Sequence, residues 1–181
     1  MDLLYVGIIV AVVLIIILCV ISISNSLNRA QVKIEEAESG IDVALEKRYD
    51  VLTKMIDVVK GYAKHEKETL FEVINLRKGM SVDEKAKESE KMDANFEKIN
   101  VLAESYPELK SSENYKTLQQ AIADTEEHLQ AARRMYNANV SHFNQMLVTF
   151  PKSVIANSKG LTKKEFFEAD EKKKADVKVD V

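Results

Sequence analysis

Residues 3–23 read LLYVGIIVAVVLIIILCVISI, an apolar run without a charged residue, proline, asparagine or glutamine. An α-helix rises about 1.5 Å per residue, so this run reaches about 31 Å and matches a hydrocarbon core of about 30 Å. The sequence therefore predicts a helix that crosses a lipid bilayer through residues 3–23. The remainder of the chain is then a domain tethered to that membrane.

A cleaved secretory signal is the competing interpretation of this run. Such a signal needs a basic leading region, a shorter apolar core and small residues before the cut. Only Met1 and Asp2 precede the run, and Ile17 and Leu18 are too large for a lipoprotein cleavage before Cys19. We therefore expect an uncleaved anchor.

The orientation of the anchor follows from its basic flanks. Arg29 and Lys33 lie on the C-terminal side, and basic residues favour the cytoplasmic side of a membrane. The sequence predicts a single-pass protein of the cell membrane, with its N-terminus outside and its main domain in the cytoplasm.

Composition limits what the rest of the chain can be. We expect three parts, an anchor at 1–25, one domain at 26–169 and a disordered charged tail at 170–181. The 26 basic and 29 acidic side chains nearly balance, which argues against a nucleic-acid partner. The single Cys19 lies inside the apolar run, which excludes disulfide and thiol chemistry. Five glycines and two prolines are too few turn residues for an all-β domain, so an all-α fold is expected.

Three stretches of the domain carry apolar residues at three-four spacing, as in a coiled-coil-like bundle. The first is predicted to continue the anchor helix to about Lys78. The second begins at Ser81, which forms a capping box with Glu84, and stops at Pro107. The third runs from Ser112 to Phe150. The stripes are Ile34, Ile41, Leu45, Leu52, Met55, Val59 and Tyr62; Met92, Phe96, Ile99, Ala103 and Tyr106; and Tyr115, Leu118, Ile122, Leu129, Ala132, Tyr136, Phe143, Leu147 and Phe150.

Short connections between long helices predict an antiparallel, up-and-down bundle of three long helices. A short C-terminal helix is expected around 163–169, with Phe166 and Phe167 covering one end of the core. The opening turns of the second helix, 83–91, are almost wholly charged and are expected to be solvated.

The sequence offers no pattern for catalysis, metal binding or a cofactor. A di-iron bundle needs Glu-x-x-His segments, but the residues three before His65, His128 and His142 are not carboxylates. Neither a Gly-x-Ser-x-Gly elbow nor a phosphate-binding glycine loop occurs. We therefore expect no catalytic, cofactor or metal site.

Polar residues on or beside the apolar stripes are the candidate site. Buried charges are costly unless they are paired, so these residues are interpreted as interhelical ion pairs. A polar cleft for a ligand or partner, and exposed unrelated charges, remain as alternatives. The candidates are Arg48, Asp50, Glu66, Glu126, Arg133, Arg134 and Tyr136, with Thr125 beside them.

Several short segments make the family resemblance. The chain resembles the LemA family, and the resemblance implies one N-terminal membrane helix, a cytoplasmic helical bundle and no established reaction. Thr53-Lys54 and Leu161 depart from the family pattern. The segments are Arg48-Tyr49-Asp50, 59–66 (VKGYAKHE), 106–110 (YPELK), 131–134 (AARR), Tyr136-Asn137 and Phe150-Pro151.

These features predict a non-enzymatic, membrane-anchored scaffold or adaptor for other membrane-associated proteins. The alternative is a small-molecule or lipid-headgroup binding module that uses Arg48, Glu66, Glu126 and Arg133. A pocket lined by those charges would favour the second function.

Overall fold

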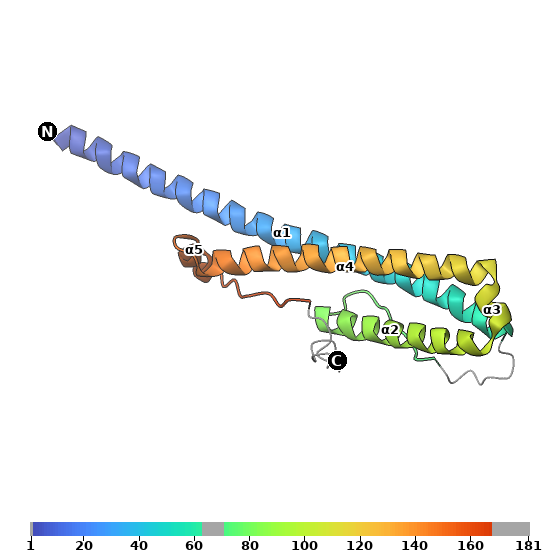
Figure 1. Ribbon diagram of the computed structural model, residues 1–181. Helices are drawn as coiled ribbons and strands as arrows, with labels where there is room; N and C mark the ends of the chain where they lie inside the picture. The colour runs from blue at the N-terminus through green and yellow to red at the C-terminus, as the bar shows by residue number, and fades with distance from the viewer. Residues whose placement is uncertain (1, 63–70, 168–181) are drawn as a thin grey trace, which may run out of the picture.

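The computed structural model describes residues 2–62 and 71–167, which contain helices and no strand. Three long helices lie side by side, and the first extends far beyond the other two (Figure 1). The all-α prediction is confirmed for this part of the chain. The helices are α1 (Asp2–Tyr62), α2 (Val82–Ser105), α3 (Pro107–Ser111), α4 (Glu113–Val148) and α5 (Lys152–Ser158).

Helix α1 joins the apolar run to the bundle without a break, over 61 residues. Residues 3–22 are exposed along their whole length. Among the described residues, α1 is the one helix long and apolar enough to cross a membrane, judged by length and composition.

The predicted end of the first helix near Lys78 is wrong, because α1 ends at Tyr62 and residues 71–78 are not helical. Side chains of α2 bind the backbone of this segment instead. Asn95 accepts from the Glu72 N–H at 2.8 Å and donates to the Glu72 carbonyl at 2.9 Å. The Glu88 carboxylate accepts from the Asn75 N–H at 2.8 Å. Long-range hydrogen bonds therefore satisfy backbone groups that a helix would have paired locally.

The predicted start of the second helix is confirmed. Ser81 caps α2, its hydroxyl accepts from the Glu84 N–H, and the Glu84 carboxylate accepts from the Ser81 N–H. Gly79 precedes this cap with a φ of 81°, a left-handed conformation that favours glycine.

The C-terminal part differs from the prediction. The short helix is α5, directly after Pro151, whereas residues 161–167 are not helical. Asn137 and Asn144 of α4 exchange hydrogen bonds with the backbone of this segment, at Phe167 and Lys164. Phe167 is buried as expected, but Phe166 is exposed.

The predicted up-and-down order is wrong for the first two long helices. Lys85 of α2 contacts Glu38 of α1, and the later Asp93 contacts the later Arg48, so α1 and α2 run in the same direction. Helix α4 runs antiparallel to both (Figure 1). The segment 71–80 makes this possible because it runs antiparallel to α2 and brings the chain back to the level at which α2 starts.

The buried apolar residues form two clusters, one after the other along the bundle. The α5-side cluster ends at Leu45 on α1 and Leu129 on α4. The α3-side cluster begins at Leu52 on α1 and Met92 on α2. The buried polar residues Arg48 and Ser89 fall between these limits.

Candidate functional site

A polar layer of charged and hydroxyl side chains separates the two apolar clusters. We define it as Arg48 of α1, Ser89 and Asp93 of α2, and Glu126 and Arg133 of α4. Arg48 is 3% exposed and lies at its centre.

The Arg48 guanidinium of α1 contacts polar-layer residues of both α2 and α4. It forms ion pairs with Asp93 and with Glu126, the latter at 2.7 Å. It also donates to the Ser89 hydroxyl at 3.1 Å. The Phe96 ring lies 5.2 Å from the guanidinium carbon and completes its surroundings. Arg48 therefore ties α1 to both α2 and α4.

Arg133 shares the same serine. Its guanidinium donates to the Ser89 hydroxyl at 2.7 Å and lies 4.6 Å above the Phe167 ring. Burial lowers the pKa of Arg133, with the Arg48 charge adding to the effect, while Glu126 and Asp93 oppose it. Arginine nevertheless stays protonated in proteins. The layer thus holds two cations and two carboxylates, and the charges compensate one another.

Another buried cation, Lys85, lies outside the polar layer, one helical turn before Ser89 on α2. Lys85 is 4% exposed, and its ammonium lies 2.9 Å from Glu38 and 2.7 Å from Asp42 of α1. Burial alone would lower the pKa of Lys85, but the hydrogen bonds to Asp42 and Glu38 outweigh it, and the pKa is raised. The prediction that residues 83–91 are solvated is wrong for the face that packs in the bundle, where Lys85, Glu88 and Ser89 are buried. It is confirmed for the opposite face, where Asp83, Lys87 and Glu90 are exposed.

The structure brings together three of the predicted site residues, namely Arg48, Glu126 and Arg133. Asp50 and Arg134 are exposed and lie outside the polar layer. Tyr136 is buried near Phe167 and donates to the Glu165 carbonyl at 3.1 Å, and burial raises its pKa. Glu66 lies outside the described residues.

Ser89, Asp93 and Lys85 were not predicted. Their signal in the sequence was weak, because they sit among many charged residues in the first turns of α2. The heptad spacing from Ser89 to Phe96, a residue of the predicted stripe, could have placed Ser89 on the buried face.

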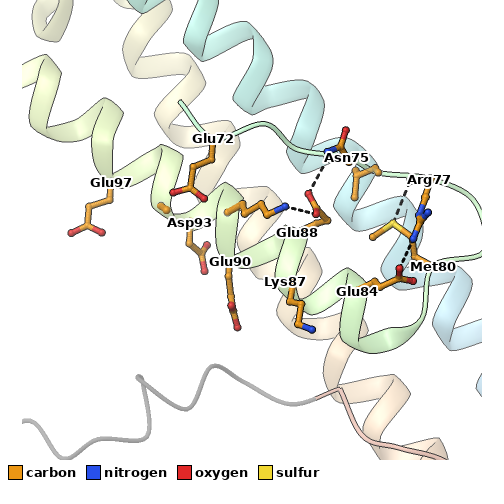
Figure 2. A pocket seen from close by; sticks show the side chains of 13 residues that line it. Glu72, Asn75, Arg77, Met80, Glu84, Lys87, Glu88, Glu90, Asp93 and Glu97 are labelled. Carbon is orange, nitrogen blue, oxygen red and sulfur yellow. Dashed lines mark hydrogen bonds and ion pairs between the residues drawn. The ribbon is translucent and has the colours of Figure 1, made fainter. Parts of the chain in front are cut away.

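A large open hollow lies elsewhere, between the returning segment 71–77 and α2 (Figure 2). Its volume is about 1040 Å³, and Asp93 alone among the polar-layer residues lines it. Acidic side chains outnumber basic ones along it. The charged lining residues are Glu72, Glu84, Glu88, Glu90, Asp93, Glu97, Arg77, Lys87 and Lys91.

Among the described residues, the one buried carboxylate that lines this hollow, Glu88, already has partners. Glu88 accepts from the Asn75 N–H, as Figure 2 shows, and pairs with Lys91 at 2.7 Å. Burial alone would raise the pKa of Glu88, but Lys91 and the Asn75 N–H outweigh it, so the pKa lies below its ordinary value of 4.5. Within residues 2–62 and 71–167, no group of three or more histidine, cysteine or acidic residues could hold a metal ion.

The fold and the polar layer define a class of all-α proteins with one long apolar helix that continues into a charged-layer bundle. Residues 37–181 match the LemA family model. Protein LemA of Metamycoplasma hominis is 32% identical over 158 residues, which cover 84% of this chain and 72% of that protein. The chain belongs to the LemA family.

Proposed function

We propose that this chain is a membrane-anchored scaffold or adaptor, without catalytic activity, that holds its bundle at a fixed position on the cytoplasmic face of the cell membrane. The observation that carries the proposal is the continuity of α1 from the apolar run into the bundle core. With about 1.5 Å per residue, the portion of α1 after Ile23 extends roughly 58 Å. A rigid rod of this kind suits a protein that positions others.

The interior of the bundle supports the scaffold over the ligand-binding alternative. The Arg48 charge is already paired with Asp93 and Glu126, and Ser89 accepts from both arginines. The ligand-binding alternative would use Arg48, Glu126 and Arg133, and none of these three residues lines the large hollow. A ligand at the polar layer would have to displace these ion pairs.

The test compares the tagged full chain with its anchor alone, residues 1–25, in cross-linked cells solubilised in mild detergent. A scaffold should retain a defined set of membrane proteins that the anchor alone does not retain. The same set with both chains, or cross-links to neither, would contradict the proposal.

The cytoplasmic orientation rests on Arg29 and Lys33 and has its own test. Protease added to intact cells should leave the bundle uncut, and protease added to opened cells should digest it. Digestion in intact cells would reverse the orientation.

A further inference from the structure

The α4–α5 corner, residues 148–159, lies beside the point where α1 leaves its apolar run. The Lys159 ammonium at the end of this corner donates to the Ser24 hydroxyl at 2.8 Å and to the Asn28 side-chain oxygen Oδ1 at 2.7 Å. Figure 1 shows α5 at the end of the bundle from which α1 projects. Since the apolar run ends at Ile23, these contacts place the Lys159 end of the corner one to five residues, or about 2 to 8 Å along α1, beyond the end of the run.

The corner exposes large apolar side chains. Phe150 is 79% exposed, Val148 is 65% exposed and Val154 is 58% exposed. By contrast, Phe143, two turns earlier on α4, is completely buried. An aromatic ring left in water at this level suggests an apolar environment that the chain itself does not supply.

The same end of the bundle is basic. The segments 24–34 and 137–164, which meet there, contain six basic residues and no acidic residue. Acidic residues begin directly outside these segments, at Glu35 and Glu165, so the basic excess is confined to this end of the bundle. The six are Arg29, Lys33, Lys152, Lys159, Lys163 and Lys164.

We propose that the α4–α5 corner is a second membrane contact, which inserts Phe150 and Val154 among the headgroups of an anionic bilayer while the surrounding lysines bind lipid phosphates. This inference rests on the proposed membrane anchor. Exposed apolar side chains flanked by Lys and Arg are the pattern of interfacial membrane segments. The occupant is lipid because the corner is held at the depth where the apolar run meets water.

Two contacts would fix the bundle against rotation. A single helix leaves the bundle free to turn about the helix axis, whereas a corner held beside it at the bilayer surface selects one face. The faces of α2 and α4 would then have a defined direction relative to the membrane plane.

Tryptophan fluorescence can test this contact in the full chain, which has no native tryptophan. Phe150→Trp, Leu14→Trp and Val101→Trp are each reconstituted in nanodiscs that contain phosphatidylglycerol and doxyl-labelled lipid. Leu14 lies in the apolar run, and Val101 is an exposed apolar residue of α2 at the α3 end of the bundle. Val154→Trp provides a second probe of the corner should Phe150→Trp not fold.

We expect strong quenching of Leu14→Trp and little quenching of Val101→Trp. Phe150→Trp should be quenched at least twofold more strongly than Val101→Trp and should emit at a shorter wavelength. Quenching at Leu14→Trp with equal signals from Phe150→Trp and Val101→Trp would overturn the second contact and leave the anchor intact. Absence of quenching at Leu14→Trp would overturn the anchor and the inference together.

The charge component has a separate arm. Lys152→Glu/Lys163→Glu/Lys164→Glu, placed in the Phe150→Trp chain, should lose most of the extra quenching in phosphatidylglycerol nanodiscs. In phosphatidylcholine nanodiscs the same substitutions should change it little. Equal quenching with and without the substitutions in both lipids would overturn the proposed binding of anionic headgroups.

Discussion

The Arg48 guanidinium of α1 lies 2.7 Å from the Glu126 carboxylate of α4, and Asp93 of α2 contacts the same guanidinium nitrogen. The arginine side chain is 4% exposed, whereas the two carboxylates are 36% and 34% exposed. One buried cation is thus held by two half-buried anions from different helices. Removal of the anions is therefore more costly than removal of exposed charges elsewhere.

Neutralising both anions should destabilise the bundle strongly. Asp93→Asn/Glu126→Gln leaves the Arg48 charge buried without an ionic partner, for which we expect a loss of about 3 to 5 kcal/mol in the free energy of unfolding. Urea unfolding of the detergent-solubilised chain, followed by circular dichroism, measures it. The control Asp50→Asn/Glu127→Gln makes the same charge change at exposed positions and should cost less than about 1 kcal/mol. Equal losses in the two variants would show that Arg48 does not depend on its carboxylates.

Removing the buried cation as well should restore part of the lost stability. Arg48→Met in the Asp93→Asn/Glu126→Gln chain leaves no buried charge on α1 and keeps a long apolar side chain against Phe96. We expect it to be about 1 to 4 kcal/mol more stable than the chain that retains Arg48, because apolar replacements of buried ion pairs are neutral or favourable. The same urea unfolding checks this. A further loss of stability would mean that the hydrogen bonds of Arg48 to Ser89 outweigh its buried charge.

The sequence contained enough to predict the helical stripes and the capping box of Ser81 and Glu84, because both depend on residues close together in the chain. The sequence was not enough to predict that α2 runs parallel to α1. The stretch 63–78 has no helix-breaking residue. The hydrogen bond that Asn95 donates to the segment 71–78, and the one that Glu88 accepts from it, arise only after the fold brings these residues together.

The buried and paired residues of α2 were not predicted for the same reason. Arg48 and Glu126 were recognisable because they lie on or beside otherwise apolar stripes. Asp93 and Lys85 were hidden among the charges of residues 83–93, and their pairing with α1 requires α2 to run parallel to it. Periodicity predicts which face is buried but gives no partner for a charge on that face.

Acid should weaken the attachment of the returning segment to α2. The pKa of Glu88 lies below its ordinary value of 4.5, so the folded chain binds fewer protons here than the unfolded chain as the pH falls through that range. The stabilisation by Glu88 is therefore complete above pH 4.5 and is lost as the pH falls through the lower, folded pKa. Thermal melts near neutral pH and below pH 4.5 should show a smaller acid-induced fall in Tm for Glu88→Gln than for the unaltered chain. Glu127→Gln, an exposed control on α4, should keep the full fall, and an identical fall in all three chains would remove Glu88 from the acid response.

A chain that begins at Ser24 should fold without the apolar run. Residues 3–22 are exposed, and both buried clusters consist of residues from Leu27 onward, so the truncation removes no fully buried side chain. The contact of Lys159 with Ser24 and Asn28 is also retained. We expect a protein that is soluble without detergent and that shows a helical circular dichroism spectrum and a cooperative melt. Its Tm should lie close to that of the detergent-solubilised full chain, because Ile23 is the one residue of the run that packs against a buried cluster, and it is only partly buried. A truncated chain that aggregates or loses its helical signal would show that the run is part of the folded unit and not only the proposed anchor.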